Sequence, residues 1–392
     1  MKKNPLRPRP LTGIAAVLTA SIALTACGSD AKSAGTPSNA ASAVKDPIVT
    51  TYDGGLYVLD GESLKVAKDI PLDGFLRINP AGNDRHLMVS TGTGFRVLDA
   101  LSPELTSVEF KGSKPGHVVR HAGRTVLFAD GTGEVTILDS KTVGDAKAAT
   151  RTYKSATPHH GVAIELENGE LVTTLGTEEK RVGIVVLDKD RKEIARNESC
   201  PGVHGEATAK DEVVVIGCQD GVLIYKGGVI TKVKSPTEYG RIGNQAGSDT
   251  SRIVLGDYKK DADAELERPE QISLINTETG TLKLVGIGTS YTFRSLGRGP
   301  QGEALVLGTN GKIHVIDPEA GKVTKTIPVI EKKWTEPLEW QEARPALFVR
   351  GGTAFVSDPA TKNLHAVDIA SGKVLVTSPL PKAPNELSGI QH

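Results

Sequence analysis

Several histidines of this chain occur at positions where their imidazoles could bind a metal ion together. His204 and Glu206 lie two residues apart on a predicted strand, so both side chains point to one face of it. His117 opens another predicted strand, and the adjacent pair His159 and His160 precedes a third. Three imidazole nitrogens with a carboxylate or water satisfy the tetrahedral preference of Zn²⁺. We therefore expect a zinc site here, with Glu206 as the fourth ligand or as a neighbour that orients an imidazole.

The spacing of these histidines is the reason for grouping them. His117 and His204 each lie nine residues before the first apolar residue of the strand that follows, and His160 lies eleven before its counterpart. A single histidine in a β protein is more often structural than a ligand. We favour a metal site because these histidines occupy equivalent positions in consecutive repeats. Only one of His159 and His160 can face a given side of a regular strand. The spacing does not choose between them.

Two cysteines bracket the strand pair that carries His204. The first strand is expected at residues 204–209 and the second at residues 213–216, with a polar turn between them. In an antiparallel hairpin the start of the first strand lies beside the end of the second, which places Cys200 next to Cys218. A disulfide is favoured over metal ligation, because the leader described below directs the chain to an oxidising compartment.

From residue 47 onward the chain repeats a strand pattern about every forty to fifty residues. Each repeat contains an apolar strand that ends in an acidic or amide residue, usually followed by a turn, as in Asp317 and Asp368. Four short strands per repeat at this period are typical of a β-propeller blade. We count eight repeats and therefore predict an all-β, eight-bladed propeller over residues 47–392, with seven blades as the alternative. The first repeat lacks its innermost strand, so residues 385–392 are expected to supply it and close the ring.

The first 46 residues have the composition of a leader and a tether. A basic start and an apolar run end in Leu24-Thr25-Ala26-Cys27-Gly28, which resembles a bacterial lipoprotein lipobox. The resemblance implies a signal peptide over residues 1–26, lipidation of Cys27 and a flexible tether over residues 27–46. An ordinary secretory signal is the alternative. We expect an extracytoplasmic protein, in the periplasm or at the cell surface, anchored to the membrane as a lipoprotein.

Composition and motifs restrict the class of function. The segment expected to be removed holds four basic side chains, which leaves 43 basic against 47 acidic ones and a formal charge of −4. This balance argues against nucleic-acid binding. No Gly-x-Ser-x-Gly or Walker-type motif is present, so we do not expect an enzyme. A zinc-activated water could support hydrolase or lactonase chemistry, and a propeller that only docks partner proteins is a further alternative.

The histidine-bearing motifs carry a family resemblance. Pro158-His159-His160-Gly161, the segment from Cys200 to Ala207, and Pro384-Asn385-Glu386-Leu387 resemble the AztD-type zinc metallochaperones, which are exported β-propellers. The resemblance implies a protein that passes zinc to the solute-binding protein of a zinc ABC importer. It also implies zinc ligation by His117, His159 or His160, and His204. We expect the chain to be a monomer. Residues 28–46 contain no histidine, unlike the histidine-rich N-terminal segment of some members, so a second zinc site is not expected there.

Overall fold

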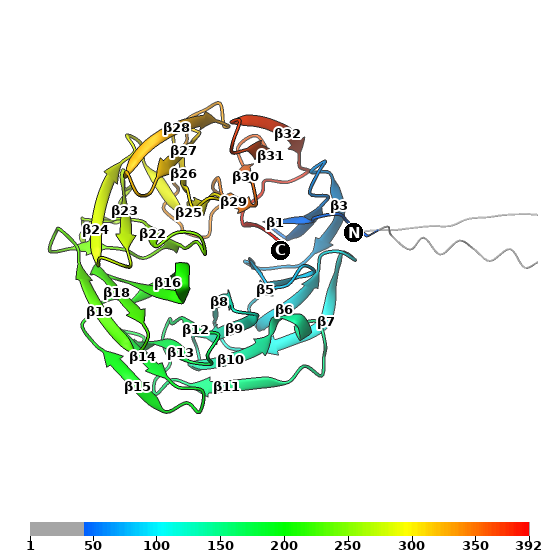
Figure 1. Cartoon of the computed structure of the whole chain (residues 1–392). Coiled ribbons are helices and arrows are strands. Elements are labelled where there is room, and N and C mark those ends of the chain that lie inside the picture. The colour runs from blue at the N-terminus through cyan, green and yellow to red at the C-terminus, as the bar shows by residue number, and fades with distance from the viewer. Residues whose placement is uncertain (1–42, 392) are drawn as a thin grey trace, which may run out of the picture. The chain divides into compact units, whose positions relative to one another are not determined.

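A computed structural model describes residues 43–391, and within them the chain forms eight antiparallel sheets arranged in a ring (Figure 1). The predicted eight-bladed propeller is therefore confirmed. Each sheet has four strands in sequence order, except that the first blade takes its inner strand from the chain end. Two short 3₁₀ turns, Ser140–Thr142 and Lys210–Glu212, are the helical elements of this region.

Within each blade the strands follow one another from the inside of the ring outward. The first four blades are β33 (Leu387–Gly389), β1 (Ile48–Tyr52), β2 (Gly55–Leu59) and β3 (Val66–Pro71); β4 (Arg77–Pro80), β5 (His86–Ser90), β6 (Gly94–Asp99) and β7 (Glu104–Lys111); β8 (Pro115–His121), β9 (Arg124–Ala129), β10 (Glu134–Asp139) and β11 (Thr150–Lys154); β12 (Ala163–Glu165), β13 (Leu171–Gly176), β14 (Arg181–Leu187) and β15 (Glu193–Asn197).

The other four blades have the same order. They are β16 (His204–Ala209), β17 (Val213–Cys218), β18 (Asp220–Lys226) and β19 (Val229–Lys234); β21 (Gln245–Ala246), β22 (Ile253–Gly256), β23 (Gln271–Asn276) and β24 (Thr281–Gly286); β25 (Tyr291–Arg298), β26 (Ala304–Gly308), β27 (Lys312–Asp317) and β28 (Lys322–Pro328); β29 (Leu347–Arg350), β30 (Thr353–Asp358), β31 (Asn363–Asp368) and β32 (Lys373–Pro379). The two-residue strand β20 (Gly240–Arg241) forms a bridge to β18 of the fifth blade.

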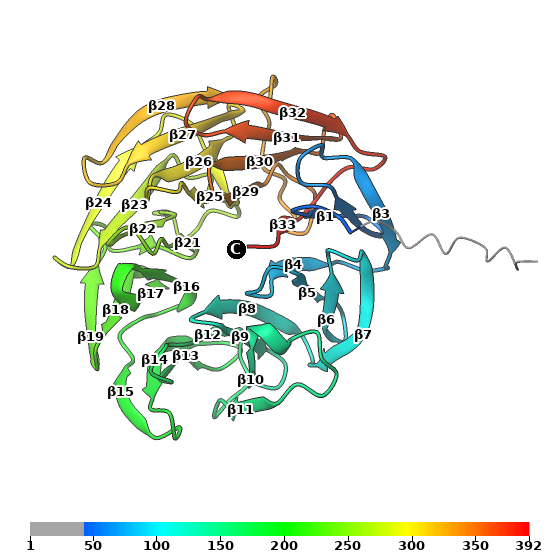
Figure 2. The same cartoon turned by 45° about the vertical axis from the view of Figure 1, so that its right-hand side comes forward.

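The C-terminal strand closes the ring, as predicted. β33 pairs antiparallel with β1, with Val49 opposite Ser388. Figure 2 shows this end of the chain running toward the middle of the ring beside β1. Further bonds from the Asn385 and Glu386 backbone to Thr51 extend the contact. The inner edge of β1 is thereby paired, and the first blade gains its fourth strand from the end of the chain.

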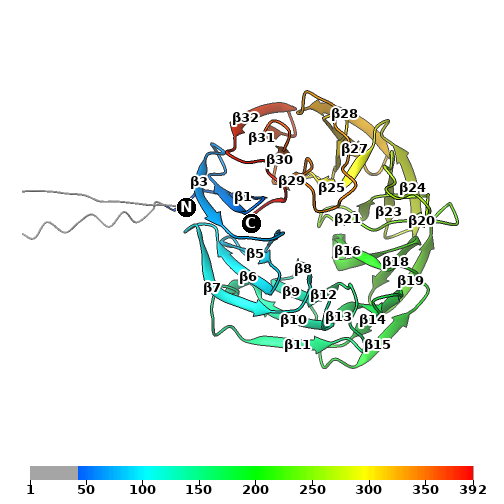
Figure 3. The ribbon, with the colours of Figure 1, turned by 180° about the vertical axis from the view of Figure 1, so that it is seen from behind.

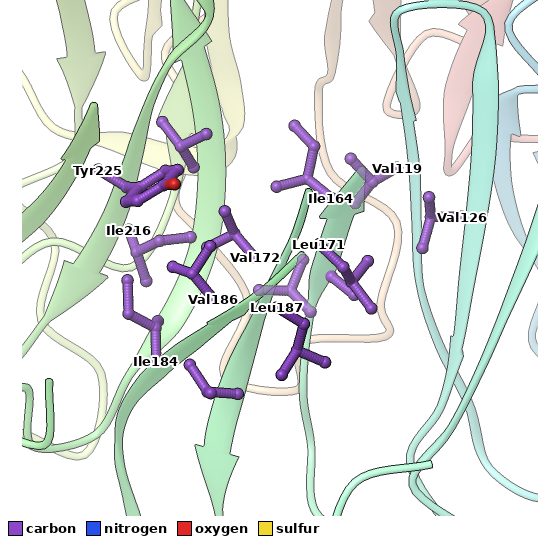
Figure 4. Close-up of a cluster of buried hydrophobic side chains, with 14 of the residues drawn as sticks. Val119, Val126, Ile164, Leu171, Val172, Ile184, Val186, Leu187, Ile216 and Tyr225 are labelled. Carbon is purple, nitrogen blue, oxygen red and sulfur yellow. The ribbon is translucent and has the colours of Figure 1, made fainter. Parts of the chain in front are cut away.

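Apolar side chains between neighbouring blades form the core. The second and third strands are buried on both faces, as in β17, where all six residues are buried. Outer strands alternate between exposed and covered residues, as in β28. Figure 4 shows the largest cluster, in which Ile164, Val172, Ile184 and Ile216 from neighbouring blades pack together. Burial at both sheet faces explains why these strands are continuous runs of Val, Ile and Leu.

The recurring acidic residue at the end of the third strand caps a turn. The Asp317 carboxylate accepts hydrogen bonds from the backbone N–H groups of Glu319 and Ala320, and Gly321 follows with a φ of 61°. Asp368 and Gly372 repeat the arrangement. A side-chain carboxylate that replaces a backbone acceptor, followed by a left-handed glycine, makes a tight connection to the outer strand.

The expected leader and lipidation site lie outside the described residues. Residues 1–42, which include the predicted signal peptide and Cys27, are not described, so these assignments stay predictions. The described end of the predicted tether contacts the propeller: Val44 is buried and its backbone N–H bonds to Leu101 at 2.9 Å. In the part of the chain from Ala43 onward, no helix has the length and apolarity needed to cross a membrane.

A buried carboxylate joins the third and fourth blades. Glu165, at the end of β12, has a side chain 1% exposed and forms ion pairs with Arg124, Arg151 and Arg191. Burial acts to raise the pKa of this carboxyl, but the hydrogen bonds and charges of Arg151 and Arg191 outweigh it and hold the pKa below its usual range. A carboxyl with a lowered folded-state pKa stabilises the fold above its unfolded pKa, and this contribution is lost as pH falls through the folded pKa.

We expect Glu165→Gln to lower the free energy of unfolding by about 3 kcal/mol at pH 7, because three guanidinium groups lose their anion. The difference from wild type should shrink as pH falls below 4.5, the usual pKa of the carboxyl. Denaturant unfolding at pH 7 and pH 3 measures it. Glu193→Gln, at an exposed ion pair with Arg196, is the control and should change stability little. An equal loss at both pH values would contradict the assignment.

Candidate metal site in the central channel

Three consecutive blades present a histidine at the same level of the ring. His117 lies on β8, His160 in the segment that leads into β12, and His204 opens β16. These inner strands lie together near the centre of the ring in opposite views (Figures 1 and 3). The shared phase of the histidines in the sequence thus corresponds to spatial neighbours.

The three imidazoles form one compact cluster. Ligand nitrogens of His117, His160 and His204 all lie within 4.8 Å of one another. The ring centroids are 5.0–5.3 Å apart, and Nε2 of His160 lies 3.0 Å from Nε2 of His204. Nitrogens bound tetrahedrally to one zinc ion at about 2.0 Å would be roughly 3.3 Å apart. The cluster is therefore close to the geometry of a three-histidine zinc site.

Hydrogen bonds place a proton on the outer ring nitrogen, Nδ1, of two of the histidines. His204 Nδ1 lies 2.6 Å from the Gly243 carbonyl oxygen, which only accepts, so this nitrogen donates its proton. His160 Nδ1 lies 2.5 Å from Oδ2 of Asp130 and donates to that carboxylate. The two Nε2 atoms face each other at 3.0 Å. Either a shared proton or a metal ion can bridge two imidazole nitrogens in this position.

The electrostatic surroundings keep two of the imidazoles neutral. Burial, followed by the neighbouring His204 and His160, lowers the pKa of His117 well below its usual value. Burial and His160 lower the pKa of His204 to about 3. Because only neutral imidazole binds a metal, both side chains are ready to coordinate at neutral pH. The His160 side chain is 40% exposed, so the cluster is accessible from solvent.

No protein-family model matches this chain. The zinc chaperone AztD of Citrobacter koseri is 24% identical over 286 residues, which span 70% of this chain and 65% of that protein, slightly under two thirds of its length. The predicted resemblance to the AztD-type proteins is confirmed. The structure of apo AztD from Citrobacter koseri has a TM-score of 0.76 at 21% identity, and the match covers 88% of this chain and 96% of that one.

The fold itself is shared more widely than with AztD. The dihydro-heme d1 dehydrogenase NirN has a TM-score of 0.58 at 11% identity, covering 87% of this chain and 74% of that one. Likeness at these identities shows a common propeller architecture and nothing about chemistry. Function must therefore be argued from the histidine cluster.

The adjacent histidines have different surroundings. His159 is 2% exposed; its Nδ1 lies 2.8 Å from the Thr157 carbonyl oxygen and its Nε2 lies 3.0 Å from Oγ1 of Thr174. Both ring nitrogens are occupied by the fold, and the ring packs edge-on against Phe128. The structure thus places His160, and not His159, with the other two histidines.

Glu206 lies beside the cluster without entering it. Its Oε2 atom is 3.8 Å from Nδ1 of His117, beyond hydrogen-bond distance, and burial raises the pKa of this carboxyl to about 8. It also lines a cavity of about 740 Å³, together with His121. His121 Nε2 bonds to Glu212 at 2.5 Å, so this histidine is held by another partner.

Sequence reasoning missed the groups that orient the imidazoles. Asp130 follows β9, and Gly243 follows β20. In a propeller blade, the turn after the second strand lies at the same end as the start of the first. Inspection of those turns for acceptors could have identified Asp130. Gly243 acts through its backbone and leaves no signal in residue type.

The disulfide and a bulge position His204. Cys200 and Cys218 form the predicted disulfide, with Cα atoms 4.9 Å apart. The pairing of β16 with β17 shifts between His204 and Glu206, where Gly205 adopts a φ of 71°. A Cβ atom at Gly205 would lie 2.6 Å from the Gly243 carbonyl oxygen, which is the partner of His204. Glycine is required here for its conformation and for this close contact.

We predict that Gly205→Ala destabilises the fold by about 1–2 kcal/mol through left-handed strain and weakens zinc binding roughly tenfold or more by displacing the partner of His204. Gly227→Ala is the matched control, because Gly227 has a φ of 53° and a Cβ atom there would meet no other atom within 4 Å. Competition titration with a zinc indicator and thermal unfolding measure both effects. Equal zinc affinity in the two variants would show that the bulge does not position His204.

Proposed function

We propose that this chain is a zinc chaperone that holds Zn²⁺ between His117, His160 and His204. The convergence of ligand nitrogens from these three histidines within 4.8 Å of one another is the main support, because it is close to the spacing around one tetrahedral zinc ion. Asp130 and the Gly243 carbonyl group fix both rings from outside, as carboxylate and carbonyl groups do at many zinc sites. The similarity to zinc chaperone AztD supports zinc as the metal.

The geometry suits a carried ion better than a permanent one. Three imidazoles leave one position of a tetrahedral zinc open, whereas structural zinc sites are closed. The exposed edge of His160 makes the ion accessible, so an acceptor could replace one ligand at a time. In this proposal Glu206 stays outside the coordination sphere and faces His117, and the protein is not an enzyme.

The proposed acceptor is the solute-binding protein of a zinc ABC importer, in keeping with the AztD resemblance. The Cys200–Cys218 disulfide supports a place outside the cytoplasm. Lipidation of Cys27 would hold this chain, as a monomer, at the membrane where such an importer resides. In this arrangement zinc passes between two proteins on the same surface without release into solution.

We expect one tight zinc ion per chain, with affinity reduced roughly 100-fold or more in His117→Ala, His160→Ala and His204→Ala, because each removes one of three donors. Asp130→Asn should reduce zinc affinity roughly 10–100-fold, because the His160 ring loses the carboxylate that orients it. His121→Ala is the matched control and should keep wild-type affinity. Zinc content and competition titration provide the measurement. Binding indifferent to all three histidines would contradict the site.

Transfer is tested separately from binding. Zinc-loaded protein mixed with the metal-free binding protein should deliver its ion faster than free dissociation, measured with a chelator present as competitor. Delivery no faster than dissociation would leave a zinc-binding protein that is not a chaperone.

A further inference from the structure

Two arginines beside the histidine cluster lack an anionic partner. Arg181 opens β14 and Arg241 ends β20. The Nη1 atom of Arg181 is buried and has no hydrogen-bond partner. Across residues 43–391, neither guanidinium forms an ion pair with a carboxylate. A buried donor without an acceptor in the chain is available to an acceptor from outside it, such as a water molecule or a bound anion.

The two guanidiniums act on each other and on the site. Arg241 folds over Gly243, where a Cβ atom would lie 2.4 Å from its Nη1, and the Gly243 carbonyl oxygen accepts from His204. The Arg181 carbonyl oxygen accepts from the backbone N–H of Gly202, two residues before His204. Both arginines therefore lie beside segments that hold His204, in keeping with the effect of each charge on the pKa of this histidine.

The nearby carboxylates are already engaged. Asp130, which acts on Arg181, accepts from His160 and from the Gly161 backbone. Asp257 accepts from the backbone of Gly243 and from Asn244. A bound zinc ion would add further positive charge beside the guanidiniums. Neither carboxylate forms an ion pair with Arg181 or Arg241 in the described part of the chain.

We propose that Arg181 and Arg241 bind a carboxylate next to the three histidines, and that this carboxylate is an aspartate or glutamate side chain of the zinc acceptor. The inference rests on the proposed function. Guanidinium groups match a carboxylate with planar, charge-assisted hydrogen bonds. A carboxylate held there lies beside the open zinc position and can replace a water molecule in it. The arginines would thus recruit the first incoming ligand of the acceptor.

Acetate and cobalt provide the direct test. Co²⁺ replaces zinc in the purified protein, and acetate is titrated while the visible absorption of the cobalt is followed. We expect a saturable spectral change in wild type and at least a tenfold weaker response in Arg181→Gln/Arg241→Gln, with cobalt affinity undiminished. Arg120→Gln, on channel strand β8, is the matched control and should respond as wild type does. An equal acetate response in the double variant would overturn the carboxylate site.

Two further measurements separate the possible failures. Acetate should raise the thermal midpoint of the metal-free wild type but not that of the double variant. The carboxylate site can therefore be tested even if cobalt does not bind. A failure of cobalt to bind would contradict the proposed function but not the carboxylate site. The double variant should fold at least as stably as wild type, because a repulsion is removed. Zinc transfer from the double variant to the binding protein should be at least tenfold slower than transfer from wild type. Unchanged transfer with lost acetate binding would show that the site takes free carboxylates, and would overturn the assignment to the acceptor.

Discussion

The pairing of β33 with β1 holds the ring together, and the site depends on that closure. Once the chain end returns to the first blade, this blade has four strands like the others and the eight sheets form a closed ring. Their inner strands must then converge on one axis, and the segments that enter them meet at one end. Residues 87 positions apart in sequence, His117 and His204, become neighbours for this reason alone. The closed ring also sets the relative positions of the inner strands, which brings the three imidazoles together.

The imidazole rings of the cluster are firmly oriented, but some polar atoms at and beside it have no partner of complementary charge within the chain. His160 and His204 are each fixed by an outer hydrogen bond, and their inner Nε2 atoms face each other at 3.0 Å. Arg181 likewise has a buried donor without an acceptor. A cation between the rings and an anion beside them would satisfy both. Zinc binding would stabilise such a site, and the fourth coordination position of the ion would stay open to a ligand from a partner protein. Both properties are expected of a protein that carries a metal and transfers it.

The propeller fold and the level of the histidines in it could be predicted from the sequence, because equivalent residues of each repeat occupy equivalent positions in the blades. A constant number of residues before the second strand places His117 and His204 at one level. The absence of an innermost strand in the first repeat indicated that the end of the chain supplies it. The choice between His159 and His160 could not be made, since it depends on the path of an irregular segment before β12. The bulge at Gly205 shifts pairing by one residue without altering the hydrophobic pattern. Arg181 and Arg241 lie at the ends of strands from different repeats, and the sequence pattern does not show that both lie beside the segments that hold His204.

The most direct test of this account is diffraction from crystals of the zinc-loaded protein, with anomalous data collected on both sides of the zinc absorption edge. We predict a single zinc peak between the imidazoles of His117, His160 and His204, with Asp130 still bonded to His160 and no bond from His159. A peak at another place, or no peak at full zinc loading in solution, would contradict the central claim that these three blades hold the metal.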